Sequence, residues 1–141
     1  MSKSETPTIR LRIDLGPDSA LGPGKIALLE HIEKTGSLSQ AARELGMSYR
    51  RAWLLLDDVN RMFDDPATTA SVGGSGGGGA QLTELGRAIV KAYREIEDAA
   101  EKAAGARIAW LASCRRKVGR RSATGRRPLT ASIRRSHAAR K

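Results

Sequence analysis

The apolar and polar positions between Ser37 and Phe63 follow the pattern of two helices joined by a tight turn. In the second helix, apolar residues recur at helical spacing, which places them on one face. They are Ala52, Leu55, Leu56, Val59, Met62 and Phe63. Gly46 supplies the turn, because glycine adopts left-handed backbone conformations without steric cost. Two helices with this separation are typical of a helix-turn-helix.

Capping residues indicate where the helices begin and end. Ser37 is followed three residues later by Gln40, the pattern of a capping box. Ser48 is the expected N-cap of the second helix of the motif. A further helix is predicted before them, from about Pro23, a residue tolerated in a first helical turn, to Gly36, a typical helix end.

Strand-like segments lie on both sides of these helices. Thr8–Leu15 alternates apolar and charged residues, which predicts a half-buried strand. Ala67–Val72 is rich in small and hydroxyl-bearing residues, and an extended pattern resumes at Ala80–Thr83 after the loop Gly73–Gly79. A strand, a glycine-rich loop and a second strand after a helix-turn-helix predict a β-hairpin wing.

A long helix is predicted after Thr83, its expected cap, with a helical pattern as far as Ala112. Its apolar stripe has near-heptad spacing, which suits packing against a second copy as well as against the domain. The stripe contains Leu85, Ile89, Ala92, Tyr93, Ile96, Ala99, Ala100 and Ala103. Within it, Ile89, Tyr93 and Ile96 are the predicted dimerisation residues.

The predicted fold is mainly α with a small β-hairpin wing: a winged helix-turn-helix with a long C-terminal dimerisation helix. We expect residues 1–7 to be a disordered N-terminus and residues 8–112 to form the domain. Residues 113–141 are expected to be a disordered basic tail, because arginine pairs separated by small residues and proline cannot build a core.

The formal net charge of the 141-residue chain is +10, but the basic excess lies outside most of the domain. Residues 1–105 hold 13 basic and 15 acidic side chains, a net charge of −2, and residues 106–141 hold 12 basic and no acidic ones. The tail is equally compatible with nonspecific, salt-sensitive DNA affinity and with a solubilising role. Bulk charge therefore does not establish that the domain binds nucleic acid.

The candidate DNA contacts gather at the starts of the two motif helices and in the wing. Arginine binds guanine O6 and N7 through two hydrogen bonds, and tyrosine or serine binds phosphate. Arg50 and Arg51 are therefore expected to contact DNA, the alternative being a solvated or ion-paired arginine. Trp53 is predicted to pack in the core. The predicted contacts are Ser37, Ser39, Gln40, Ser48, Tyr49, Arg50, Arg51, Ser75, Gly76 and Gly77.

Other functional classes find less support. The glycine run lacks the Lys and Ser/Thr that a P-loop requires after its last glycine, so a wing or a flexible linker remains. One cysteine, Cys114, and two distant histidines offer neither a disulfide nor a metal cluster. No nucleophile and base stand together, so we expect no enzyme. No apolar run reaches the length of a membrane span, and a cytoplasmic, nucleoid-associated protein is expected.

Three blocks of residues resemble the N-terminal winged-helix domain of the ModE family, molybdate-responsive bacterial transcription regulators with a LysR-like helix-turn-helix. The blocks are Gly36–Ala42, Met47–Trp53 and Gly77–Thr83 followed by Gly86, within residues 8–97. The resemblance implies a homodimeric repressor or activator that binds double-stranded DNA. Its third helix would read the major groove of a palindromic site, and its glycine wing would touch the flanking backbone.

The chain departs from the family pattern in two places. Family members carry molybdate-binding domains after the winged helix, where this sequence has a short Arg-rich segment; we expect a stand-alone form that needs no cofactor. The family wing commonly has a basic residue among its glycines, where this chain has Ser75. Two alternatives remain open: a winged helix that binds a protein partner, and nonspecific nucleic-acid binding through the tail.

Overall fold

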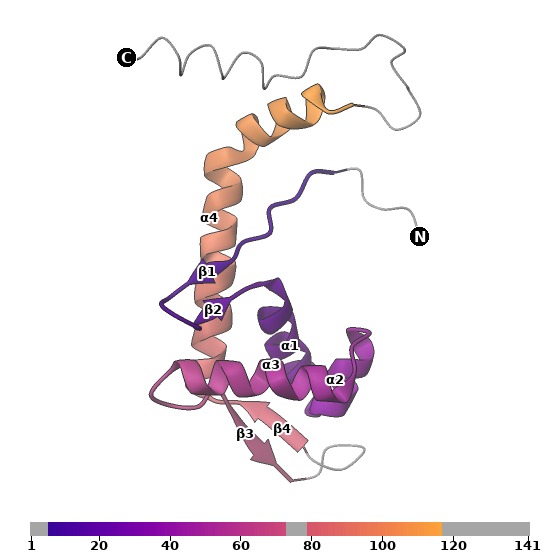
Figure 1. The fold of residues 1–141 in the computed structure, drawn as a ribbon, viewed down its shortest axis with the longest axis vertical. Coiled ribbons are helices and arrows are strands. Elements are labelled where there is room, and N and C mark those ends of the chain that lie inside the picture. Colours follow the sequence, from indigo (N-terminus) through magenta and orange to yellow (C-terminus); the bar gives the residue numbers. More distant parts are fainter. Residues whose placement is uncertain (1–5, 73–78, 117–141) are drawn as a thin grey trace, which may run out of the picture.

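The structure, a computed structural model, describes residues 6–72 and 79–116 (Figure 1). Its elements are, in chain order, β1 (Ile13–Asp14), β2 (Ala20–Leu21), α1 (Pro23–Thr35), α2 (Leu38–Glu44), α3 (Tyr49–Met62), β3 (Thr68–Ser71), β4 (Gly79–Leu82) and α4 (Glu84–Cys114). The predicted wing contacts Ser75, Gly76 and Gly77 and most of the predicted tail lie outside the described residues.

The architecture is a winged helix-turn-helix with a long C-terminal helix, as the sequence predicts. Helices α1, α2 and α3 pack together at one end of the molecule, and the antiparallel hairpin β3–β4 lies beside them (Figure 1). Helix α4 starts at the base of this wing and extends well beyond the three-helix body (Figure 1).

The predicted helix caps are confirmed. The Ser37 hydroxyl accepts a 3.2 Å hydrogen bond from the amide of Gln40, and the Ser48 hydroxyl accepts one of 3.1 Å from the amide of Arg51. Thr83 caps α4 in the same way. Gly36 ends α1 in a left-handed conformation with φ of 70°. These local features were readable from the sequence because each depends on residues within one helical turn.

The core joins α1, both motif helices, the wing and the first turns of α4. Its most deeply buried large side chains come mainly from α1, with one from α3 and one from α4. They are Ile26, Leu28, Leu29, Ile32, Val59 and Tyr93. Small residues, Ala41 and Ala42 of α2 and Ala52 of α3, are also buried. Their size lets the helices of the motif approach closely.

The wing is attached to the helix-turn-helix at both of its ends. The Asn60 side chain on α3 accepts hydrogen bonds of 2.8 and 3.2 Å from the amides of Ala67 and Thr68, where β3 begins. On the other strand, the amide of Ala80 donates a 3.0 Å hydrogen bond to the carbonyl oxygen of Gly36. The hairpin is therefore held to α3 at its base and to the end of α1 farther along β4, near the loop.

The predicted strand over Thr8–Leu15 is wrong in extent. Only Ile13–Asp14 forms a strand, and it pairs with Ala20–Leu21, a partner that the sequence pattern did not indicate. A two-residue partner cannot supply the hydrogen bonds of an eight-residue strand. The carbonyl oxygen of Leu11 instead accepts a 2.6 Å hydrogen bond from the Tyr93 hydroxyl on α4.

Candidate nucleic-acid interface

The first turn of α3 presents two arginines to solvent. Ser48 caps this turn, and Arg50 and Arg51 follow it directly, both exposed. Neither guanidinium group has a carboxylate partner among the residues that the structure describes. A further arginine on the same helix, Arg61, is paired with Asp57 at 3.1 Å. The two N-terminal arginines are therefore available to an external anion or acceptor.

Apolar side chains stand exposed next to these arginines. Trp53, predicted to pack in the core, is 49% exposed, and that prediction is wrong. The core beside α3 is filled by Ala52 and Val59, so a side chain one position after Ala52 points away from it. Leu54 is 48% exposed and Tyr49 57%. Tyr49, Arg50, Trp53 and Leu54 line one shallow hollow of about 510 Å³.

The second half of α3 is electrostatically different from the first. Asp57 is paired with Arg61, and Asp58 lies 3.9 Å from the ammonium group of Lys25 on α1. These carboxylates balance the charges of Arg61 and Lys25, so this half of the helix offers a phosphate backbone less net positive charge than the first turn does. The surface suited to a polyanion is thus the N-terminal half of α3.

The start of α2 holds three further predicted contact residues, and they differ in accessibility. Ser37 is fully buried, so we assign its hydroxyl a capping role and withdraw it as a DNA contact. Ser39 and Gln40 are partly exposed. The Ser39 hydroxyl lies 3.1 Å from that of Ser37, which orients it at the helix start.

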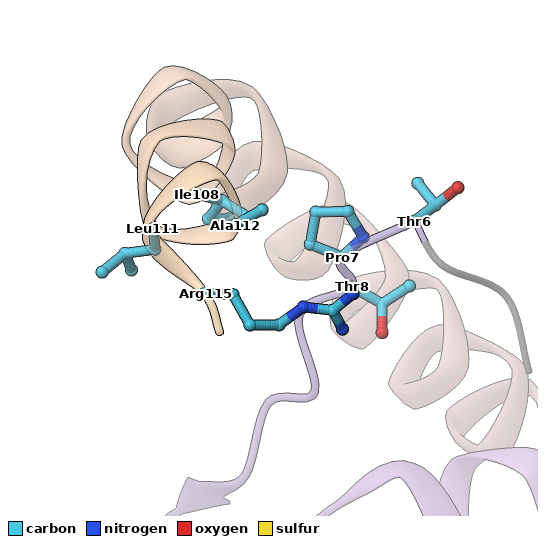
Figure 2. A pocket seen from close by; sticks show the side chains of 7 residues that line it. All are labelled: Thr6, Pro7, Thr8, Ile108, Leu111, Ala112 and Arg115. Carbon is cyan, nitrogen blue, oxygen red and sulfur yellow. The ribbon is translucent and has the colours of Figure 1, made fainter. Parts of the chain in front are cut away.

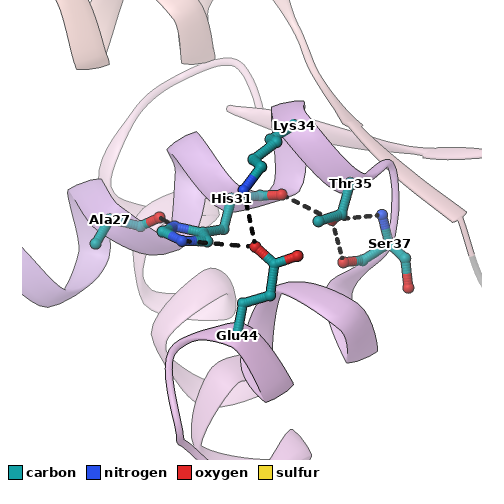
Figure 3. A network of polar contacts seen from close by, with 6 residues as sticks. All are labelled: Ala27, His31, Lys34, Thr35, Ser37 and Glu44. Atoms are coloured by element: carbon teal, nitrogen blue, oxygen red, sulfur yellow. Dashed lines mark hydrogen bonds and ion pairs between the residues drawn. The ribbon is translucent and has the colours of Figure 1, made fainter.

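A polar network fixes α2 against α1 (Figure 3). The Glu44 carboxylate on α2 lies 3.4 Å from the ammonium group of Lys34 and 3.8 Å from Nε2 of His31, both on α1. His31 is oriented by its Nδ1, 2.8 Å from the carbonyl oxygen of Ala27. The single hydrogen of the Thr35 hydroxyl is shared between the carbonyl oxygen of His31, at 2.7 Å, and that of Ser37, at 3.0 Å. The network sets the position of α2, against which α3 packs.

The predicted dimerisation residues do not share one environment. Ile89 and Tyr93 are buried against their own chain, and Ile96 is exposed. Burial raises the pKa of the Tyr93 hydroxyl, and the neighbouring Glu97 raises it further. Arg94 forms ion pairs with Glu30 on α1 and with Glu97, so this part of α4 is tied to the domain.

Helix α4 exposes a regular stripe of apolar side chains, which we call the seam. Its members are spaced alternately four and three residues apart: Ala92, Ile96, Ala99, Ala103, Ala106 and Trp110. On another side of the helix, Ile108 and Ala112 line a pocket of about 490 Å³ with Thr6–Thr8 of the N-terminal segment (Figure 2). The seam, defined by those six residues, is covered by no other described element of the chain.

Two features of the described residues bear on other classes of site. No three His, Cys, Asp or Glu residues lie together as a metal site within residues 6–72 and 79–116. No helix in this part of the chain is long and apolar enough to cross a membrane. That the protein needs no cofactor stays a prediction.

The domain is similar in sequence to known proteins. No family model matches the chain. The molybdenum transport protein ModE of Azotobacter vinelandii is 41% identical over 88 residues, 62% of this chain and 33% of the relative. The DNA-binding transcriptional dual regulator ModE of Escherichia coli K12 is 35% identical over 96 residues, 68% and 35% of the two chains. The N-terminal part of this chain is therefore similar to ModE proteins, and we call it the ModE-like domain.

The ModE-like domain is also similar to MopB of Rhodobacter capsulatus, named a molybdenum-pterin-binding protein, with 46% identity over 77 residues. These 77 residues are 55% of this chain and 28% of MopB. The chain thus spans about a third of the length of the curated relatives it matches. The predicted family resemblance is confirmed for the N-terminal region of the ModE-like chain.

Leu54 is a candidate contact residue of the ModE-like domain that is absent from the contacts predicted from the sequence. A signal was present, because Leu54 follows Arg50 by four residues and so shares its helix face. A leucine on the same helix face as an arginine that is predicted to contact DNA is itself a candidate DNA contact. The signal was hidden by Leu55 and Leu56, which continue the apolar run toward the core.

Proposed function

We propose that this ModE-like domain is a sequence-specific, double-stranded-DNA-binding unit of a transcriptional regulator. The observation that carries the proposal is the pair of exposed arginines in the first turn of the second motif helix, Arg50 and Arg51, which have no carboxylate partner among the described residues. Relatives named as transcriptional regulators support it. We propose no catalytic role.

The N-terminal half of α3 is the part that would enter the major groove. Arg50 and Arg51 would bind guanine edges, because a guanidinium group matches the O6 and N7 acceptors. The Tyr49 and Ser48 hydroxyls would bind phosphates near the helix start. The partly exposed Ser39 and Gln40 would hold the backbone from α2. Phosphate contacts fix the register of the helix, and base contacts supply the preference for one sequence.

The wing would lie along the DNA backbone next to this helix. Support comes from its attachment at Asn60 and Gly36, which holds both strands of the wing beside the motif. Contacts by Ser75, Gly76 and Gly77 remain a prediction about residues outside the described structure. Glycine backbone approaches phosphate closely because no side chain intervenes.

The proposed active form is a homodimer joined by the seam on α4. Alternating spacings of four and three residues place one stripe of a helix against a partner helix. Four of its six members are alanines, which allow a close approach, and Ile96 and Trp110 add apolar area. Two copies of α3 would then read the two halves of a palindromic site.

Selection of duplexes by the full chain from a random pool tests the proposal. We expect enrichment of one consensus with inverted repeats. Arg50→Ala should relax the consensus, whereas Arg61→Ala, which removes an arginine paired with Asp57 on the same helix, should leave it unchanged. Failure to enrich any sequence would contradict specific DNA binding, and a consensus without inverted repeats would contradict the dimer alone.

A further inference from the structure

The exposed apolar pair Trp53–Leu54 lies where a solvated helix would carry polar residues. Both side chains are about half exposed, on a helix whose opposite face already fills the core. Large apolar groups on the outer face of a helix mark a contact surface when they form a patch. Here they form one with Tyr49 and Arg50, around a single hollow.

The four residues form two adjacent rows along the helix. Arg50 and Leu54 are four residues apart and lie one turn from each other, and Tyr49 and Trp53 form the neighbouring row in the same way. Each row therefore has a hydrogen-bonding group at the N-terminal end and an apolar group one turn later. A ligand that fits both rows must offer polar acceptors and apolar groups at about 6 Å spacing.

The major groove of DNA offers that combination. Guanine presents two acceptors to an arginine, and thymine presents a C5-methyl group, the apolar group on its major-groove edge. Four residues of helix advance about 6 Å and one base step about 3.4 Å, so the two bases would lie within two steps of each other. Arg50 and Arg51, which have no carboxylate partner in the part of the chain that the structure describes, favour this polyanion over an apolar protein surface.

We propose that Leu54 and Trp53 read thymine C5-methyl groups next to a guanine bound by Arg50. This inference rests on the proposed DNA-binding function and specifies what its recognition helix prefers. Sequence preference would then come from two kinds of contact, hydrogen bonds at the first turn of α3 and methyl packing at the second. Removal of one methyl contact should weaken binding about fourfold, the value for one buried methylene-sized group.

Deoxyuridine substitution tests the proposal, since it removes the methyl group and leaves the hydrogen-bonding edge unchanged. The full chain is titrated with its selected duplex and with duplexes carrying deoxyuridine at each thymine in turn. We expect one or two positions in each half-site to lose about fourfold in affinity. Leu54→Ala should bind the selected duplex less tightly and lose its sensitivity to deoxyuridine at one of these positions. Trp53→Ala should lose it at the other.

Leu15→Ala is the matched control, because Leu15 is similarly exposed and lies next to β1, away from α3. It should keep both the affinity and the deoxyuridine pattern of the unmodified chain. The tryptophan emission of the full chain should shift to shorter wavelength on the selected duplex, and Trp53→Phe should abolish that shift while Trp110 is left in place. An unshifted emission would show that Trp53 stays in water and would overturn its role.

The outcomes separate this proposal from the function on which it rests. If a consensus is selected but deoxyuridine changes affinity nowhere, methyl reading is wrong and DNA binding stands. If no consensus is selected, the proposed function itself fails. If Leu54→Ala keeps the full deoxyuridine pattern while it abolishes binding to a protein partner, the patch is a protein-docking surface and the proposal is overturned.

Discussion

The amide of Ala80 on the wing donates a 3.0 Å hydrogen bond to the carbonyl oxygen of Gly36, the residue that ends α1. Beside this bond, Gly79 bridges to Ser37, the cap of α2. The wing and the helix-turn-helix thus share one junction, and its conformation depends on Gly36.

Replacement of Gly36 tests the importance of this junction. Its φ of 70° is left-handed, and no atom lies within 4 Å of an added Cβ, so the cost of Gly36→Ala is a backbone cost. We expect a loss of about 1–2 kcal/mol in the free energy of unfolding, measured by urea denaturation, and a smaller loss for Gly36→Asn. Gly24→Ala, in open space without a left-handed φ, is the control. Equal effects at both glycines would contradict the assignment.

Gly86 lies where α4 passes the start of the wing. A Cβ at this position would come within 2.1 Å of the carbonyl oxygen of Ala67, so backbone would have to move. Gly86→Ala should destabilise the domain by about 1–3 kcal/mol in urea denaturation. Gly105→Ala, in the same helix with open space around it, should stabilise by about 0.5–1 kcal/mol. A neutral or stabilising Gly86→Ala would show that this approach is not close in solution.

Tyr93 should make stability depend on alkaline pH. Its buried hydroxyl has a pKa above the ordinary 10.0, so the folded state favours the protonated form. This contribution is fully present below pH 10.0 and is lost as the pH rises through the folded-state pKa. Tyr93→Phe should cost about 1 kcal/mol at neutral pH and show a shallower loss above about pH 10. Parallel pH profiles of the two proteins in urea denaturation would contradict this role.

The seam on α4 should determine the oligomeric state. Ile96→Glu places a charge in the middle of the apolar stripe and should convert the chain from dimer to monomer in sedimentation equilibrium. Glu101→Gln changes the charge by the same amount at an exposed position outside the seam and should leave the dimer intact. A dimer that survives Ile96→Glu would place the interface elsewhere.

The parts predicted correctly from the sequence depend on neighbours along the chain. Ser48, Gly46 and Thr83 follow from capping and turn chemistry within a few residues. The fold class follows from the order of such elements. The family resemblance predicted the kind of protein, but it did not predict the position of any side chain.

The errors concern relationships between distant segments. The strand over Thr8–Leu15 was overextended because its pairing partner is short, and the carbonyl of Leu11 is bound by Tyr93, 82 positions later. Tyr93 was assigned to a dimer because its stripe continues to Ile96, yet the domain already covers it. Alternation and periodicity indicate which face is apolar, but not which neighbour covers it.

The most direct test of the central claim is the ratio of dissociation constants for the selected duplex and a scrambled one, at fixed salt. We expect the full chain to favour the selected duplex by about a thousandfold or more. The double variant Arg50→Ala, Arg51→Ala should lose at least about tenfold of this preference, and Arg61→Ala should retain it. If the double variant weakens binding to both duplexes equally, so that the ratio is unchanged, these arginines do not read bases and the assignment of α3 as the reading helix is contradicted.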